Sequence, residues 1–206
     1  MDKQKLLNEI TIIFLASIIL SISTTFFNLS NFLITLIYFI IIIGSNFLIK
    51  KLVAYYYESD INLKFWSLQN YGLKAKAHFK KPLMMLWLPL LLAPLNWKWF
   101  AILETEIIAK TERVSKRHGL YRFSAITEWH IALITGAGII LNILLSIIGY
   151  SFNLEIFSKL SIYYAAWSII PLSNLDGSKI LFGNRTLWLF LTIIIFITLS
   201  WGIVIF

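Results

Sequence analysis

The chain contains no cysteine among its 206 residues. Disulfide bonds, thiolate metal ligands and a cysteine nucleophile are therefore excluded. Histidine is also scarce, and its three copies, His78, His118 and His130, stand far apart in the sequence. The His-Glu-x-x-His pattern, which binds catalytic zinc on a helix, occurs nowhere. A zinc centre would have to be assembled from residues that the sequence keeps distant.

Acidic residues are few, with 10 against 18 lysines and arginines, and the net charge is +8. A positive balance of this kind raises the question of nucleic acid, but no segment interleaves basic and aromatic residues as a single-strand-binding surface does. The basic residues lie beside apolar runs, which is the pattern of cytoplasmic loops in membrane proteins. The charge therefore predicts a membrane topology and no nucleic-acid partner.

What the sequence has in abundance is apolar side chains. The composition is 59% hydrophobic and the mean hydropathy is +0.79. Several apolar runs approach the roughly 20 residues that a spanning helix needs. We predict an all-α integral membrane bundle, with one domain over residues 1–206 and the lipid bilayer as a partner. We expect a multi-pass protein of the cell (plasma) membrane, whose first run lacks a small-residue cleavage site and is an uncleaved span.

Five apolar runs are predicted to span the membrane, at residues 10–27, 32–49, 129–150, 156–171 and 187–206. A further run, 82–95, is different because it contains Pro82, Pro89 and Pro94. Its roughly 14 residues would rise only about 21 Å as a helix, short of a core of about 30 Å, and proline disrupts helix interiors. We predict a short re-entrant or interfacial segment here. Six full spans are the alternative.

The re-entrant interpretation places the lysines on one side of the membrane, as the positive-inside rule requires. Residues 50–128 then form one cytoplasmic or interfacial insert, with the N-terminus also cytoplasmic. Residues 52–66 combine tyrosines, Phe65 and Trp66 with lysines, which suits the headgroup zone of the bilayer; a partner-binding surface is the alternative. Residues 110–122 are the most polar stretch and are predicted to be a solvated loop.

One acidic residue lies where a predicted span opens. Asp176 follows the helix breaker Pro171 and precedes Gly177. A charge at the bilayer centre costs about 2.5–3.5 kcal/mol or more, so such a residue is a functional candidate. Irregular backbone at membrane depth is tolerated only against protein or a water-filled cavity. We therefore expect a polar pocket around Asp176.

The span 129–150 contributes the second polar group of this pocket. Gly136 and Gly138 would let a neighbouring backbone approach closely, and Asn142 lies one turn beyond Gly138. Asn142 and Asp176 then lie on neighbouring spans, and each needs a partner. They can bond to one another or to nearby backbone as contacts between helices, or they can belong to a functional site.

At these residues the chain resembles a known family. Gly138-Ile-Ile-Leu-Asn142 resembles the Gly-Pro-Leu-x-Asn span of the site-2 protease family of intramembrane zinc metalloproteases. Asn174-Leu-Asp-Gly-Ser-Lys-Ile-Leu181 resembles the later Asp-Gly motif, and Trp188 follows as in small archaeal-type members. The order of segments is similar over roughly residues 32–190. The resemblance implies a zinc held by two histidines and the later aspartate, with a glutamate as general base.

The chain departs from the family at the metal motif. Asn46 and Lys50 stand at the two histidine positions, and Phe47 stands at the glutamate position. A lysine ammonium has three donors and no acceptor, and phenylalanine cannot transfer a proton. The resemblance thus implies a degenerate motif with no catalytic residue, no cofactor and no bound zinc. Asn142, Asp176 and Gly177 are the retained family positions, and Asp176 would be the ligand if any metal were bound.

In place of a metal we predict an ion pair between Lys50 and Asp176, with Asn46 and Asn142 supplying hydrogen bonds. The alternative is that Lys50 extends to the cytoplasmic headgroups and leaves Asp176 to Asn142 or water. The function implied is that of a proteolytically inactive relative that binds or regulates transmembrane proteins or serves in a membrane complex. An active zinc metalloprotease with non-standard ligands is one alternative. A small transporter or channel is another, although the sequence has no inverted repeat.

Overall fold

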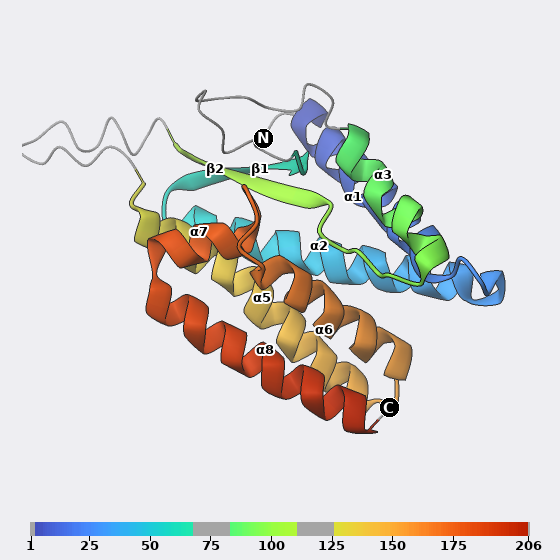
Figure 1. Cartoon of the computed structure of the whole chain (residues 1–206). Helices are drawn as coiled ribbons and strands as arrows, with labels where there is room; N and C mark the ends of the chain where they lie inside the picture. The colour runs from blue at the N-terminus through green and yellow to red at the C-terminus, as the bar shows by residue number, and fades with distance from the viewer. Residues whose placement is uncertain (1–2, 68–82, 111–125, 206) are drawn as a thin grey trace, which may run out of the picture.

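The computed structural model describes residues 3–67, 83–110 and 126–205 (Figure 1). Most of these residues are helical. The predicted solvated loop at 110–122 lies almost wholly outside the described residues, as do His78 and His118. The helices are α1 (Lys3–Thr24), α2 (Phe32–Tyr56), α3 (Leu83–Leu92), α5 (Glu128–Ser151), α6 (Glu155–Ile169), α7 (Asp176–Gly183) and α8 (Arg185–Ile205).

Three of the described helices are long and apolar enough to cross a membrane: α1, α2 with the short turn before it, and α5. The protein is therefore a mostly helical membrane protein, as its composition predicts. The other two predicted spans correspond to α6, which has 15 residues, and to α8, whose described apolar part is residues 185–200.

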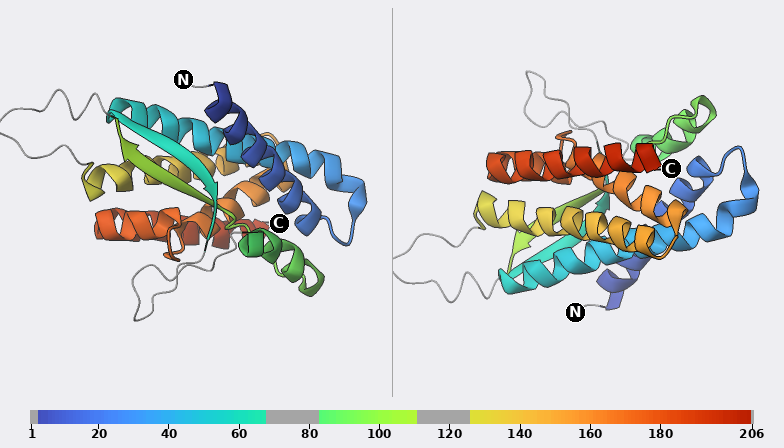
Figure 2. Two further views of the ribbon diagram at one scale, coloured as in Figure 1. Left: turned by 90° about the horizontal axis from the view of Figure 1, so that it is seen from above. Right: turned by 90° about the horizontal axis from the view of Figure 1, so that it is seen from below.

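Helix α5 lies among the other long helices and packs against α2, α6, α7 and α8 (Figures 1 and 2). Glycines on α5 allow this close packing. A Cβ added at Gly138 would lie 2.8 Å from Nδ2 of Asn46 on α2, and one at Gly149 would lie 2.7 Å from the ring of Phe157 on α6. At Gly138 the close neighbours are side chains of α2, Asn46 and Lys50, rather than the backbone that the sequence predicts.

The all-α prediction is incomplete, because two strands pair beside α2. The strands β1 (Ser59–Phe65) and β2 (Leu103–Ala109) are antiparallel, with Ser59 opposite Ala109 and Phe65 opposite Leu103. Ile61 and Leu63 of β1 are buried against the helices, whereas Asp60 and Lys64 are exposed. The predicted interfacial segment 52–66 is thus the end of α2 followed by a strand. The side chains of a strand alternate between its two faces. In this segment the aromatic residues and lysines suggested a headgroup segment and drew attention away from that alternation.

The predicted re-entrant run, 82–95, corresponds to α3 and the 3₁₀ turn that follows it. Helix α3 lies along α1, and Ser23 Oγ donates a hydrogen bond to the Pro89 carbonyl (2.8 Å). The chain continues through a 3₁₀ turn (Ala93–Leu95), reverses at Asn96, which has φ of 55°, and returns to β2. The returning chain still lies near the α1–α2 turn at Lys98, which lines a cavity together with that turn. The segment therefore extends beyond residue 95, where the predicted run ended.

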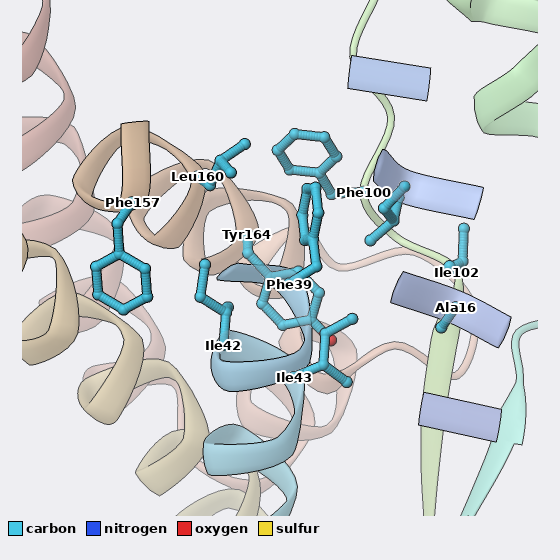
Figure 3. Close-up of a cluster of buried hydrophobic side chains, with 10 residues drawn as sticks. Ala16, Phe39, Ile42, Ile43, Phe100, Ile102, Phe157, Leu160 and Tyr164 are labelled. Atoms are coloured by element: carbon cyan, nitrogen blue, oxygen red, sulfur yellow. The ribbon is translucent and has the colours of Figure 1, made fainter. Parts of the chain in front are cut away.

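A buried apolar cluster joins this returning segment to three helices, α1, α2 and α6 (Figure 3). Phe100 lies edge-on against Phe39 of α2, with ring centroids 5.5 Å apart. Because lipid tails are as apolar as these side chains, close packing rather than removal from water holds the cluster together. The fully buried members include Phe39, Ile42 and Ile43 of α2 and Phe100 and Ile102 before β2. On α6, Phe157, Leu160 and Tyr164 are almost fully buried.

The chain breaks between α6 and α7 where the sequence predicts an opening. Helix α6 ends at Ile169, just before Pro171, and Ser173 adopts a positive φ of 47°. The Ser178 hydroxyl donates to the carbonyl oxygens of Ser173 (2.5 Å) and Leu175 (2.7 Å), which holds the turn. Asp176 is thereby fixed as the first residue of α7.

Candidate functional site

The structure brings together the two residues that the sequence pairs. Lys50 Nζ on α2 donates a hydrogen bond to Oδ2 of Asp176 on α7. Both side chains are buried, with 3% of Lys50 and 8% of Asp176 exposed. The alternative in which Lys50 extends away to the headgroups does not occur. The predicted pairing is thus present, and the lysine ammonium occupies one carboxylate oxygen of Asp176.

A third residue completes the pair. Thr105 Oγ1 on β2 donates to the other carboxylate oxygen of Asp176, Oδ1, at 2.8 Å. Lys179 Nζ, one turn further along α7, donates to the backbone carbonyl of Thr105. Sequence reasoning missed both contacts. The available signal was the alternating pattern of residues 103–109, which puts Thr105 on the buried side of a strand.

The two asparagines lie beside the pair but do not support it as predicted. Asn46 and Asn142 are buried, at 3% and 0% exposed. Among the described residues, Nδ2 of Asn46 and both side-chain amide atoms of Asn142 have no hydrogen-bond partner. The prediction that they supply hydrogen bonds to Lys50 and Asp176 is wrong, because Thr105 takes the remaining carboxylate oxygen.

Phe47, at the position of the family's glutamate, faces an apolar cluster. It packs with Ala54 of α2, Ile61 and Leu63 of β1, and Ile134 of α5. The ring thus serves packing on this side, and the Lys51 ammonium lies over it, 5.2 Å from the ring centroid.

Gly177 is required by its surroundings. A Cβ there would overlap the carbonyl oxygen of Ile169 and lie 2.7 Å from that of Ile170. Any side chain would push α7 away from the end of α6. Close contact with backbone, rather than chemistry, therefore accounts for a glycine directly after Asp176.

A small cavity of about 20 Å³ adjoins the pair. Asn46, Lys50, Tyr164, Ser168 and Asp176 contribute to its lining. A volume of this size accommodates about one water molecule. It cannot admit a peptide segment without movement of the surrounding helices.

The donor set around Asp176 does not fit a metal ion. Within the described part of the chain, no group of three or more histidine, cysteine, aspartate or glutamate side chains is placed to hold one. Both oxygens of Asp176 already accept hydrogen bonds, and one of the donors is a cation. His130, at the start of α5, lies against Tyr57 (ring centroids 4.6 Å apart) and contacts Thr127.

A second buried ion pair, which the sequence did not suggest, starts from the next residue of α2. Lys51 Nζ lies 2.7 Å from Oε2 of Glu9 on α1. The Glu9 side chain is 7% exposed, and its other oxygen, Oε1, has no hydrogen-bond partner in the described residues. Lys51 is 31% exposed and also lies over the Phe47 ring. Helix α2 is thus tied by adjacent lysines to α7 and to α1.

On β2, two glutamates experience opposite environments. Burial raises the pKa of Glu104, and the cations Lys179 and Lys64 oppose that shift only in part. The hydrogen bond from Lys64 lowers the pKa of Glu106, which lies 2.6 Å from that ammonium. The strand therefore carries one poorly compensated carboxylate near the site and one paired carboxylate at the surface.

Comparison of this chain with protein-family models, with curated proteins and with solved structures gives no match. The resemblance to the site-2 protease family consequently rests on residues of this chain alone.

Proposed function

We propose that this protein is a site-2-protease-like membrane protein that does not hydrolyse peptide bonds and instead binds another transmembrane protein. The observation that carries the proposal is the ion pair between Lys50 and Asp176. The resemblance assigns this position to the zinc site. The aspartate of the ion pair, Asp176, would be the third zinc ligand there.

The loss of chemistry follows from the same residues. A zinc-bound water requires a positive ion held by neutral or anionic ligands. Here a lysine ammonium is directed at the carboxylate, so a metal ion in that place would meet both a repelling charge and an occupied ligand. Phe47 supplies no general base, because its ring is packed among apolar side chains.

Binding is the function that remains when the hydrolytic residues are replaced. The helices present apolar side chains at their outer faces, including Leu189, Ile193 and Phe196 of α8, which are 53%, 58% and 66% exposed. Their spacing of four and three residues places them on one side of the helix. Such a stripe packs against lipid or against a transmembrane helix of a partner.

We propose the membrane topology that accompanies this function: five spans, a cytoplasmic N-terminus and a re-entrant segment at α3. The course of α3 and the returning chain to β2 supports it, because both ends of the segment point toward the same end of the bundle (Figure 1).

Single cysteines introduced at Ser115, which lies outside the described residues, and at Ser151 should be labelled from opposite sides. Labelling from the same side would restore six spans.

The decisive experiment rebuilds the metal motif. The triple variant Asn46→His, Phe47→Glu, Lys50→His is purified without chelator, and zinc is measured by elemental analysis beside the parent protein. We expect less than a tenth of a zinc per parent chain and about one per variant chain, lost again when Asp176→Ala is added. Zinc in the parent that Asp176→Ala removes would support an active protease with non-standard ligands. Failure of a folded triple variant to bind zinc would contradict the alignment with the family.

The binding half of the proposal needs its own test. Photo-crosslinking groups placed at Ile193 on α8 are activated in native membranes, and cross-linked proteins are identified by mass spectrometry. We expect one dominant transmembrane partner, with no cleavage product of it when the protein is overproduced. Cross-links to lipid alone at Ile193 and at Phe196 would oppose a partner on this face.

A further inference from the structure

A cavity of about 500 Å³ lies where α1 turns into α2, and it shares no lining residue with the cavity at the Lys50–Asp176 site. Its walls come from the end of α1, the first turns of α2 and α6, and the segment that returns from α3. These parts lie toward the same end of the bundle in both views of Figure 2. The cavity is thus formed by four segments that the fold brings together.

The charge of this cavity is positive. Lys98 and Lys159 both line it, whereas no aspartate or glutamate does. Glu155 stands one turn before Lys159 on α6 but is not part of the lining. The structure shows no ion pair of Lys98 with any described residue. Lys159 also has an interaction of its own. The two ammonium groups together line a space large enough for a small anionic group.

The uncharged polar lining residues leave mainly amide donors for a ligand. The hydroxyls of Thr24 and Thr35 already donate to backbone carbonyls of their own helices. Asn28 Oδ1 accepts a hydrogen bond from Ser30 (2.6 Å), so the amino end of that amide is the end left to donate. Asn31 precedes the first residue of α2 and makes no side-chain cap bond. The available donors suit an acceptor-rich anion.

The surroundings of the cavity are those of a headgroup layer. Phe27 in the α1–α2 turn, Trp97 beside Lys98 and Phe152 in the α5–α6 turn are 71%, 60% and 72% exposed. Aromatic side chains collect at the level of lipid headgroups, next to the ends of spanning helices. A ligand in this cavity would therefore be at the depth of the phosphates of a bilayer leaflet.

We propose that this cavity is a phosphate-binding site, in which Lys98 and Lys159 hold the phosphate of an anionic lipid headgroup. Basic pockets between helices at the membrane surface bind such headgroups, and each lysine contributes on the order of a fivefold gain in affinity. Free inorganic phosphate presents the same acceptor oxygens, and the experiment separates the two sources. The site is independent of whether the Lys50–Asp176 region is catalytic.

The test uses the full-length protein in an uncharged detergent. Short-chain phosphatidylglycerol, phosphatidylcholine and inorganic phosphate are titrated separately, and bound ligand is counted by native mass spectrometry. We expect one phosphatidylglycerol per chain, bound at least tenfold more weakly by the double variant Lys98→Gln, Lys159→Gln. The variant Lys98→Arg, Lys159→Arg should retain binding, since it keeps both charges.

The control removes two charges elsewhere. Lys3→Gln, Lys5→Gln at the start of α1 should leave phosphatidylglycerol affinity within twofold of the parent. Millimolar inorganic phosphate that fails to displace the lipid assigns the site to headgroups. Phosphate that binds alone, with the same dependence on Lys98 and Lys159, supports the phosphate site but assigns it to the free ion. Equal phosphatidylglycerol binding by the parent and the Gln double variant would overturn the proposal, as would no binding of either ligand.

Discussion

Two adjacent lysines of α2 form two buried ion pairs of different completeness. Lys50 is 3% exposed and pairs with Asp176, whose second oxygen accepts from Thr105. Lys51 is 31% exposed and pairs with Glu9, whose second oxygen has no partner among the described residues. Successive helical residues project about 100° apart, so the two side chains reach different neighbours.

The difference shows what makes a buried charge tolerable. Removing two charges from water costs several kcal/mol for each ion, and attraction offsets this only when the remaining hydrogen-bonding capacity is satisfied. The Lys50–Asp176 pair meets that condition through Thr105, whereas the Lys51–Glu9 pair relies on partial exposure of its lysine. The first pair is therefore expected to behave as one unit, and the second as two loosely coupled charges.

The largest expected effect is at the complete pair. Lys50→Met and Asp176→Asn should each destabilise the protein by about 3–5 kcal/mol, because each leaves an uncompensated buried charge or its unsatisfied partner. The double variant should cost much less than the sum of the two. Unfolding in detergent, followed by circular dichroism, gives the three values of a double-mutant cycle. Additive effects would show that the two side chains do not act as a pair.

Removing the third group tests why the pair is complete. Thr105→Val keeps the shape of the side chain but takes away the hydrogen bond to Oδ1 of Asp176. A bond to a charged group contributes about 1.5–3 kcal/mol, so a loss in that range is expected in the same unfolding measurement. Thr105→Ser should restore most of it. A Val variant as stable as the parent would mean that the site does not depend on β2.

The incomplete pair should be weaker. Glu9→Gln is expected to cost about 1 kcal/mol, since Lys51 is near the one-third exposure at which water already compensates much of its charge. Lys51→Met should also be mild. Raising the salt concentration from 0.05 to about 0.5 M should reduce the contribution of this pair more than that of Lys50–Asp176. A cost for Glu9→Gln equal to that of Asp176→Asn would remove the distinction between the pairs.

The Lys50–Asp176 pair was predicted because the resemblance to the site-2 protease family places both residues at its metal-binding positions. The sequence was insufficient for Thr105, whose position depends on a strand that lies 71 residues away from Asp176 along the chain. The strand with which it pairs, β1, was obscured because the tyrosines and lysines in 52–66 also fit a headgroup segment. The Glu9–Lys51 pair depends on how α1 is rotated, which no local pattern determines.

The asparagines illustrate a further limit. Burial of Asn46 and Asn142 follows from their place in apolar runs, and the structure confirms it. Their partners were assigned by assuming that neighbouring polar groups satisfy one another. The Lys50 side chain, passing over Gly138, and the Thr105 hydroxyl instead satisfy Asp176 first. Competition among donors is decided by geometry within a few ångströms, which the sequence does not contain.

The smallest expected effect extends the comparison to the two glutamates of β2. Burial raises the pKa of Glu104 above its ordinary 4.5, so this group contributes stability below about pH 4.5 that is lost as the pH rises through its folded-state pKa. The hydrogen bond from Lys64 lowers the pKa of Glu106, so its contribution is present above about pH 4.5 and lost as the pH falls through its lower folded-state pKa. At pH 7 we therefore expect Glu104→Gln to stabilise the protein slightly and Glu106→Gln to destabilise it slightly. The effect at the exposed Glu106 should stay within about 0.5 kcal/mol. Unfolding in detergent at pH 7 and pH 4 should show the two differences shrinking together at the lower pH. Changes of the same sign for both variants at pH 7 would mean that the burial of Glu104 does not distinguish it from the paired Glu106.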